Sequence, residues 1–183
     1  EAEYFASHGI KDMIYTVSMV SSKVPRASAL LHDGVDLKFI LHNLEAARGL
    51  AETAHQLGIE MTILIELDMG DKRGGLTSGS DELLTLARFI DGAPGLRLGG
   101  ILSHAGNSYG CRTPAEMQKV ANKERDEALH MASRLREDGL PCEMISIGST
   151  PTAIHATDLS GITEIRSGVY MFGDVFQYEI HSH

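Results

Sequence analysis

Two short stretches of the sequence combine glycine and hydroxyl groups in a pattern that could bind a phosphate. Ser149 and Thr150 follow Gly148 directly before a segment that we expect to be helical. Backbone N–H groups at such a position, together with two side-chain hydroxyls, can surround the oxygens of an anion. Gly168 would allow a second close approach of the backbone. The alternative is that Ser149 or Thr150 caps the helix, which is the commoner use of serine and threonine.

Two other glycine-rich stretches could contact an aromatic or anionic ligand. His104 precedes Tyr109 by five residues, so an imidazole could stack on a flat ring while the phenol binds it. Arg73 lies between Gly70 and Gly74 and could hold a phenolate or a carboxylate. The alternatives are a structural histidine and a solvated surface turn.

Arg166 falls inside a stretch that we expect to form a strand. An arginine inside a barrel must pair with a carboxylate or face a ligand, because the burial of an unpaired charge is costly. Glu164 and Glu66 are the alternative partners. Arg166 is therefore a further candidate for ligand binding.

Short apolar runs that alternate with longer helical patterns indicate parallel strands joined by crossover helices. The run Met61–Leu67 is apolar nearly throughout, as expected when both faces of a sheet are covered. We therefore expect an α/β fold, namely a (β/α)8 TIM-type barrel that is incomplete, with about six of the eight strand-helix units. The expected strands span residues 12–19, 37–42, 61–68, 98–104, 144–149 and 164–172, and the expected helices span 26–33, 44–57, 81–89 and 114–137.

The composition argues against several classes of partner. The formal net charge is −9, from 16 basic and 25 acidic residues, without a block of like charges, so we expect no nucleic acid. No apolar run is long enough to span a membrane, and residues 1–7 do not read as a secretory signal. We expect a cytoplasmic location without membrane contact. Cys111 and Cys142 lack zinc-site spacing and are predicted to be reduced thiols, with no metal site in this chain.

Four segments together resemble one group of enzymes. They are residues 66–75 (ELDMGDKRGG), 104–110 (HAGNSYG), 148–152 (GSTPT) and 163–174 (TEIRSGVYMFGD). Their order and spacing resemble the D-serine dehydratase and D-threonine aldolase group. That group shares its barrel with the alanine racemase N-terminal domain and belongs to the fold-type III enzymes, which use pyridoxal 5'-phosphate (PLP). The resemblance covers nearly the whole chain.

The resemblance implies that PLP binds at the mouth of the barrel. The residues that it places near the phosphate are Ser149, Thr150, Gly168 and Val169, with Tyr170 also binding the cofactor, and those near the ring are Arg73 and His104 or Tyr109.

Arg166 falls where the racemase branch has an arginine that faces the pyridine nitrogen. Dehydratase and aldolase members often carry another residue there. A guanidinium at that nitrogen would disfavour its protonation and weaken the ring as an electron sink. Arg166 therefore leaves the type of reaction open.

The resemblance also implies a Schiff-base lysine on the first barrel strand. None of the six lysines matches that position; they are Lys11, Lys23, Lys38, Lys72, Lys119 and Lys123. We therefore expect residues 1–183 to be a partial PLP-binding barrel that lacks the first two strands. We also expect it to lack the C-terminal β domain, in which the group carries a metal site of histidine and cysteine. A divalent metal is then expected only in the parent protein.

The expected function of the complete protein is that of a PLP-dependent lyase on small D-amino acids. It would be of the D-threonine aldolase or D-serine dehydratase type, and a homodimer, as is usual for the group. This chain alone is expected to be inactive. The alternatives are an amino-acid racemase of the same barrel, a non-catalytic PLP carrier, and a phosphate-binding barrel without PLP.

Overall fold

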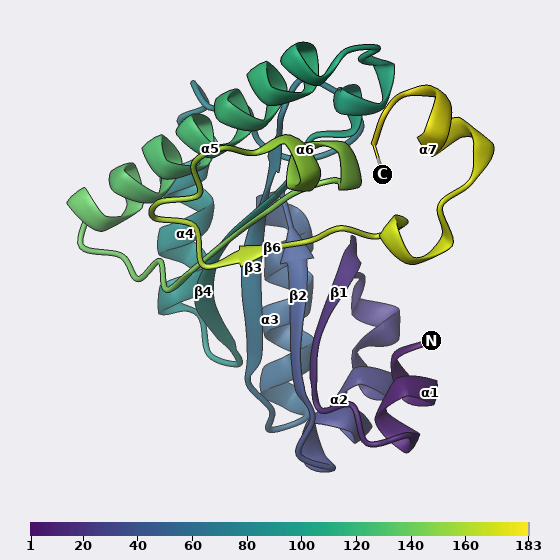
Figure 1. Cartoon of the computed structure of the whole chain (residues 1–183). Helices are drawn as coiled ribbons and strands as arrows, with labels where there is room; N and C mark the ends of the chain where they lie inside the picture. The colour runs from purple at the N-terminus through teal and green to yellow at the C-terminus, as the bar shows by residue number, and fades with distance from the viewer. Residues whose placement is uncertain (183) are drawn as a thin grey trace.

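Six parallel strands form one curled sheet in the order in which they occur along the chain. The structure, a computed structural model, describes residues 1–182 except for the side chain of Tyr170. The sheet curves into about half of a barrel (Figure 1), which confirms the expected incomplete (β/α)8 architecture. The strands are β1 (Asp12–Ser18), β2 (Asp36–Leu41), β3 (Met61–Asp68), β4 (Leu96–His104), β5 (Met144–Ile147) and β6 (Glu164–Ile165).

Helices connect the strands and cover the convex side of the sheet (Figure 1). Thr113 caps the longest one with a capping box to Glu116, and Pro114 follows at the first helical position, as the sequence predicted. No helix in the described part of the chain is long and apolar enough to cross a membrane. The helices are α1 (Ala2–Ser7), α2 (Val24–His32), α3 (Leu44–Gln56), α4 (Glu82–Gly92), α5 (Pro114–Glu137), α6 (Thr150–His155) and α7 (Val175–Glu179), with short 3-10 turns η1 (Ser21–Lys23), η2 (Gly106–Gly110) and η3 (Tyr170–Phe172).

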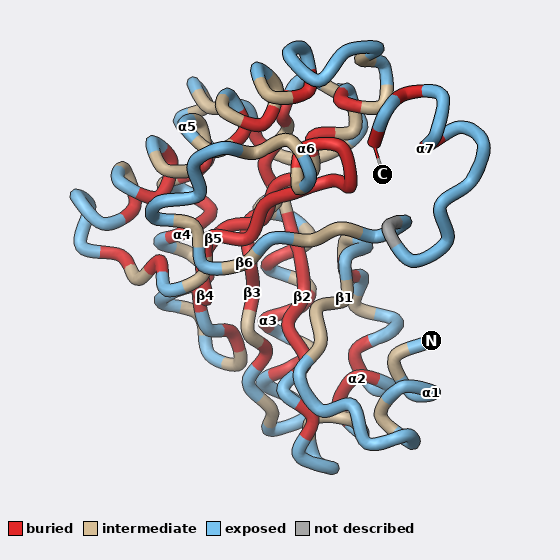
Figure 2. Tube along the Cα trace, in the orientation of Figure 1, coloured by how far each residue is buried: buried red, intermediate tan, exposed pale blue. Residues whose placement is uncertain are grey.

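Apolar side chains cover both faces of the central strands. On the convex side, Phe39, Ile63 and Leu98 belong to the large core that the helices complete. On the concave side, Ile40 and Leu64 pack with Leu102 in a smaller buried cluster. Figure 2 shows β2, β3 and β4 buried along most of their length, whereas β1 is more exposed. The nearly continuous apolar runs of the sequence arise from this double coverage.

The last strand is much shorter than the sequence predicted. Residues 164–172 were expected to be extended, but β6 contains only Glu164 and Ile165. The parallel pairing ends with the hydrogen bond from Arg166 N to Ile147 O, because the neighbouring strand β5 turns away at Gly148, where φ is 120°. Without a partner strand, residues 167–172 form a loop and η3.

Gly100 is a position at which we predict a large effect on stability. Its φ is 143°, and a Cβ there would lie 2.0 Å from Met144 O across the β4–β5 pair. Gly100→Ala should lower the free energy of unfolding by about 3–5 kcal/mol, because strain and overlap add. Gly110→Ala is the control, since a Cβ there meets nothing within 4 Å. Urea unfolding measures both variants, and an equal loss in the two would contradict the prediction.

Candidate functional site

The carboxyl ends of the strands and the loops that follow them surround a pocket of about 200 Å3. Arg73, His104 and Arg166, each selected from the sequence, all line it. They come from the β3–α4 loop, from the end of β4 and from the residue after β6. The other lining residues are Thr16, Glu66, Leu67, Asp68, Asp71, Gly74 and Leu102.

The β3–α4 loop, which carries Arg73, is held in shape by hydrogen bonds from its backbone to the Asp68 side chain. Asp68 Oδ1 accepts from the N–H groups of Gly70 at 2.9 Å and Lys72 at 3.1 Å. Gly70 and Lys72 both have positive φ, which bends the loop back over the sheet. Arg73 is exposed and makes no hydrogen bond or ion pair with any residue that the structure describes. Its guanidinium is therefore available to an anion in the pocket.

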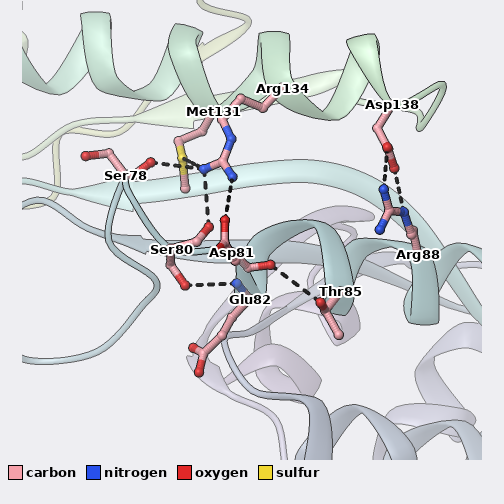
Figure 3. Close-up of polar contacts among 9 residues, drawn as sticks. All are labelled: Ser78, Ser80, Asp81, Glu82, Thr85, Arg88, Met131, Arg134 and Asp138. Carbon is pink, nitrogen blue, oxygen red and sulfur yellow. Dashed lines mark hydrogen bonds and ion pairs between the residues drawn. The ribbon is translucent and has the colours of Figure 1, made fainter.

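The other end of this loop is fastened to α5. Arg134 donates to Ser78 O at 3.1 Å and to Ser80 O at 3.2 Å, and its guanidinium lies 3.9 Å from the Asp81 carboxylate (Figure 3). Ser80 Oγ accepts from Glu82 N at the start of α4. These contacts hold the segment between Arg73 and α4 against the long helix.

His104 is held in a single orientation. Its Nδ1 lies 3.0 Å from the carbonyl oxygen of Gly148, and because a carbonyl can only accept, Nδ1 carries the proton and Nε2 is the acceptor. The Tyr109 ring lies 6.3 Å from the His104 ring and 6.5 Å from that of Phe176, centroid to centroid. His104 and Tyr109 are thus neighbours, and Phe176 extends this aromatic group.

Arg166 crosses the concave side of the sheet between two strands. Its guanidinium donates to Ser146 Oγ and to Ser103 O. Burial lowers the pKa of Arg166, and the charges of Glu164 and Glu124 act in the opposite direction. Of the partners considered from the sequence, Glu164 is reached through Ser146, whose hydroxyl donates to it. The barrel frame itself therefore fixes the direction of the guanidinium.

The two predicted phosphate-binding segments, around Ser149 and around Gly168, lie side by side, but the Ser149 side chain caps a helix. It is buried and caps α6, with its Oγ accepting from Thr152 N at 3.4 Å. Thr150 Oγ1 accepts from Val169 N at 3.1 Å and so joins the two segments. A Cβ at Gly168 would meet nothing within 4 Å, so the backbone there is open. The side chain of Tyr170 lies outside the described residues, and its proposed contact stays a prediction.

Glu124 is a central residue of the site that sequence reasoning missed. Its side chain is 1% exposed and lies beneath these segments. Oε1 accepts from Ser103 Oγ at 2.8 Å and from Gly148 N at 3.1 Å, and Oε2 accepts from Thr152 Oγ1 at 3.1 Å. A signal existed in the sequence, since Glu124 occupies the buried face of α5, which is otherwise apolar; the other members of that face are Met117, Ala121, Ala128, Met131, Ala132 and Leu135.

Lys38 is the buried lysine of the described chain, and it lies at the opposite end of the barrel from the pocket. It donates to Asp12 at 2.8 Å and to Asp36 at 2.7 Å, both at the amino ends of their strands. Burial by itself lowers the pKa of Lys38, but the hydrogen bonds to the two carboxylates outweigh it, so the pKa is raised. Lys38 is therefore held as an ammonium, which is not a nucleophile.

No group of three or more histidine, cysteine, aspartate or glutamate side chains within residues 1–182 could hold a metal ion. Cys142 is buried, and burial raises its pKa to about 11. Its thiol is therefore protonated at neutral pH.

Curated proteins similar to this chain include dehydratases and an aldolase. It is 42% identical to D-threo-3-hydroxyaspartate dehydratase of Delftia sp. (strain HT23), over 98% of the chain and 47% of that protein. It is 29% identical to D-serine dehydratase of Dictyostelium discoideum (96% of the chain, 47% of that protein) and 28% identical to D-threonine aldolase of Arthrobacter sp. (95% and 46%). The chain thus spans about half the length of these curated relatives.

The solved structure of the Delftia sp. HT23 dehydratase superimposes with a TM-score of 0.93 at 41% identity, over 98% of this chain and 47% of that one. The family model described as "Alanine racemase, N-terminal domain" matches residues 1–175. The chain therefore belongs to the alanine racemase N-terminal domain family.

Proposed function

We propose that this chain is the PLP-binding part of a lyase that acts on D-amino acids with a β-hydroxyl group. The observation that carries the proposal is the convergence of Arg73, His104 and Arg166 on one pocket at the strand ends, where Arg73 makes no hydrogen bond or ion pair with the residues that the structure describes. Three relatives with this barrel are named for the dehydration or aldol cleavage of such substrates.

The donors around the pocket suit an anionic aromatic cofactor. An unpaired guanidinium, an oriented imidazole and an open stretch of backbone at Gly168 are groups that bind a phenolate, a flat ring and a phosphate. In this proposal Thr150, Gly168 and Val169 hold the phosphate and Ser149 holds their helix in place. The ring would contact Arg73, His104, Tyr109 and Arg166, and Tyr170 would contact the cofactor as well. When bound, PLP supplies an electron sink for the bond broken at the α-carbon of the substrate.

The chain's own residues orient the reactants. His104 cannot rotate freely, because Gly148 O holds its Nδ1–H, so the imidazole face and Nε2 keep one position. Leu102, which belongs to the small concave cluster, lines the pocket on the side of the barrel interior and excludes water there.

Dehydration of 3-hydroxyaspartate is the reaction that the relatives favour. Among the three relatives, the protein named for it has the highest identity to this chain, at 42%. D-Serine and D-threonine share the β-hydroxyl and the configuration at the α-carbon, so the three substrates differ in the group on the β-carbon, which is a carboxylate only in 3-hydroxyaspartate.

Other parts of the proposal rest on the resemblance alone. They are a Schiff-base lysine upstream of residue 1, a downstream β domain with the metal ligands, a homodimer, and a cytoplasmic location. Under this proposal residues 1–183 alone are inactive.

A racemase is the second candidate, and the placement of Arg166 favours it. The guanidinium is half-buried and held by Ser146 Oγ and Ser103 O, which fixes it on the concave side of the pocket. A cation opposite the pyridine nitrogen would weaken the electron sink, which suits proton exchange better than elimination.

The test uses the complete protein with PLP in deuterated water. D-threo-3-hydroxyaspartate, D-serine, D-threonine and D-alanine are supplied separately. We expect ammonia and an oxo acid from the first two substrates, or glycine and an aldehyde from D-threonine. Deuterium at the α-carbon without release of any product would establish the racemase instead, and PLP binding without either reaction would establish a carrier.

A further inference from the structure

Three polar side chains at the carboxyl ends of neighbouring strands form a hydrogen-bonded group beside the pocket. Ser18 ends β1, His42 follows β2 and Glu66 lies near the end of β3. His42 Nδ1 lies 3.0 Å from Glu66 Oε2 and 3.1 Å from Ser18 Oγ, and Ser18 Oγ donates to Glu66 Oε2 at 3.4 Å. Glu66, an alternative partner of Arg166 from the sequence, has Ser18 and His42 as its partners in the structure.

The protons of this group are assigned by its chemistry. A carboxylate accepts, so the His42 proton lies on Nδ1 and points to Glu66 Oε2, which leaves Nε2 as the acceptor. Neither Glu66 Oε1 nor His42 Nε2 forms a hydrogen bond with the residues that the structure describes. The group therefore has one unused acceptor at each of its two ends.

The two ends lie in different pockets. Glu66 lines the pocket of about 200 Å3 together with Arg73 and His104. His42 lines a separate pocket of about 300 Å3, where the loop before α3 meets the start of α4 at Asp81. Side-chain exposures of 22% for Glu66 and 31% for His42 show that neither is sealed in the core. The hydrogen-bonded pair thus connects the proposed substrate pocket with a second, solvent-accessible one.

Part of the rim of the second pocket is held to α5. Asp81 and Glu82 at this rim follow the residues whose carbonyls accept from Arg134, and Ser80 Oγ accepts from Glu82 N (Figure 3). His42 is 31% exposed beside this rim, so water can reach it.

We propose that Glu66 exchanges a proton with the β-hydroxyl group of the substrate, and that His42 passes this proton between Glu66 and water in the second pocket. The inference rests on the proposed function, because only a substrate with a β-hydroxyl requires it. Ser18 is a positioning residue that holds the Glu66 carboxylate toward His42.

In a dehydration, the α-proton goes to the amine of the proposed upstream lysine. Glu66 takes the proton of His42 Nδ1 and gives it to the hydroxyl oxygen as the Cβ–O bond breaks, the bonding pair leaves with oxygen, and water forms. His42 Nε2 takes a proton from water in the second pocket, and exchange with water returns the ring to its Nδ1–H form. In an aldol cleavage the Glu66 carboxylate takes the hydroxyl proton and then releases it to water, and the Cα–Cβ pair stays on the α-carbon as the carbonyl forms.

The test compares Glu66→Gln and His42→Ala in the complete PLP-loaded protein. With a β-hydroxy substrate, kcat should fall by about 100-fold or more in each, as for loss of a general acid-base group, and imidazole should restore part of the His42→Ala rate. The exchange of the α-proton of D-alanine, which has no β-hydroxyl, should stay within about threefold of wild type. That exchange also shows that the variants are folded and hold PLP. Glu82→Gln, which changes a carboxylate in the wall of the second pocket, is the matched control and should leave both rates unchanged.

A second readout needs no activity. Nitrogen NMR of the histidine rings in the PLP-free protein should find His42 as the Nδ1–H tautomer. The Nε2–H tautomer would overturn the inference, and so would an unchanged kcat in His42→Ala. If wild type binds PLP but converts no β-hydroxy substrate, the proposed function itself fails, and the relay fails with it. If wild type converts a β-hydroxy substrate but neither variant lowers kcat, the relay alone fails.

Discussion

Replacement of Glu124 by alanine should lower the free energy of unfolding by about 3–5 kcal/mol. The carboxylate is 1% exposed and accepts hydrogen bonds from Ser103, Gly148 and Thr152. Its removal leaves two hydroxyls and a backbone N–H without their acceptor in a site where little water enters. The loss is measured by urea or thermal unfolding.

Glu124→Gln separates the charge from the shape of this side chain. The amide keeps an acceptor for Ser103 and Gly148, and its NH2 group can donate to the Thr152 hydroxyl, so the loss should be only about 1–2 kcal/mol. Glu127→Ala is the control on the same helix, because Glu127 makes a partly exposed pair with Lys123 and should change stability by about 0.5 kcal/mol or less. A loss in Glu124→Ala no larger than in Glu127→Ala would contradict this account.

The same network bears on the proposed phosphate site. Glu124 holds Gly148 N and Thr152 Oγ1, which lie on either side of the capping residue Ser149. These contacts come entirely from the protein. The β5–α6 turn is therefore formed in advance, so that ordering of the turn would cost little on cofactor binding.

The central strands and helices could be predicted from the sequence because the residues within each element indicate its type and its ends. The residues of β3 form an uninterrupted apolar run, and its observed range of Met61–Asp68 agrees with the expected one. The helix α5 has both its cap and its proline in the sequence, and its range also agrees. The end of β6 could not be predicted, because its length depends on the partner strand β5, which ends at Ile147.

The same distinction holds for the site. Arg73, His104 and Arg166 stand out in short glycine-rich or strand motifs, and they do line one pocket. Glu124 and His42 act through partners 21 to 28 residues away in the chain, and nothing near them in sequence indicates those partners. Contacts of this kind become visible only when the strands are side by side.

The placement of Arg166 is the feature that bears most on the choice of reaction. Its guanidinium is bound to Ser146 Oγ and Ser103 O, so its direction does not depend on a ligand. If it faces the ring nitrogen as proposed, the protein has to carry out a lyase reaction with an unprotonated ring. The β-hydroxyl proton relay through Glu66 would then matter more, since a weaker electron sink leaves more of the barrier to acid-base catalysis.

Covalent capture of PLP shows whether the complete protein holds this cofactor through a lysine. The complete protein and residues 1–183 alone are each mixed with PLP, and their visible absorbance is recorded before and after treatment with borohydride. We expect the complete protein to show an absorbance band that borohydride converts into a stable covalent adduct, and we expect no such adduct from residues 1–183. If the complete protein neither binds PLP nor becomes labelled, the proposed PLP-dependent function is wrong, although the fold and the family stand.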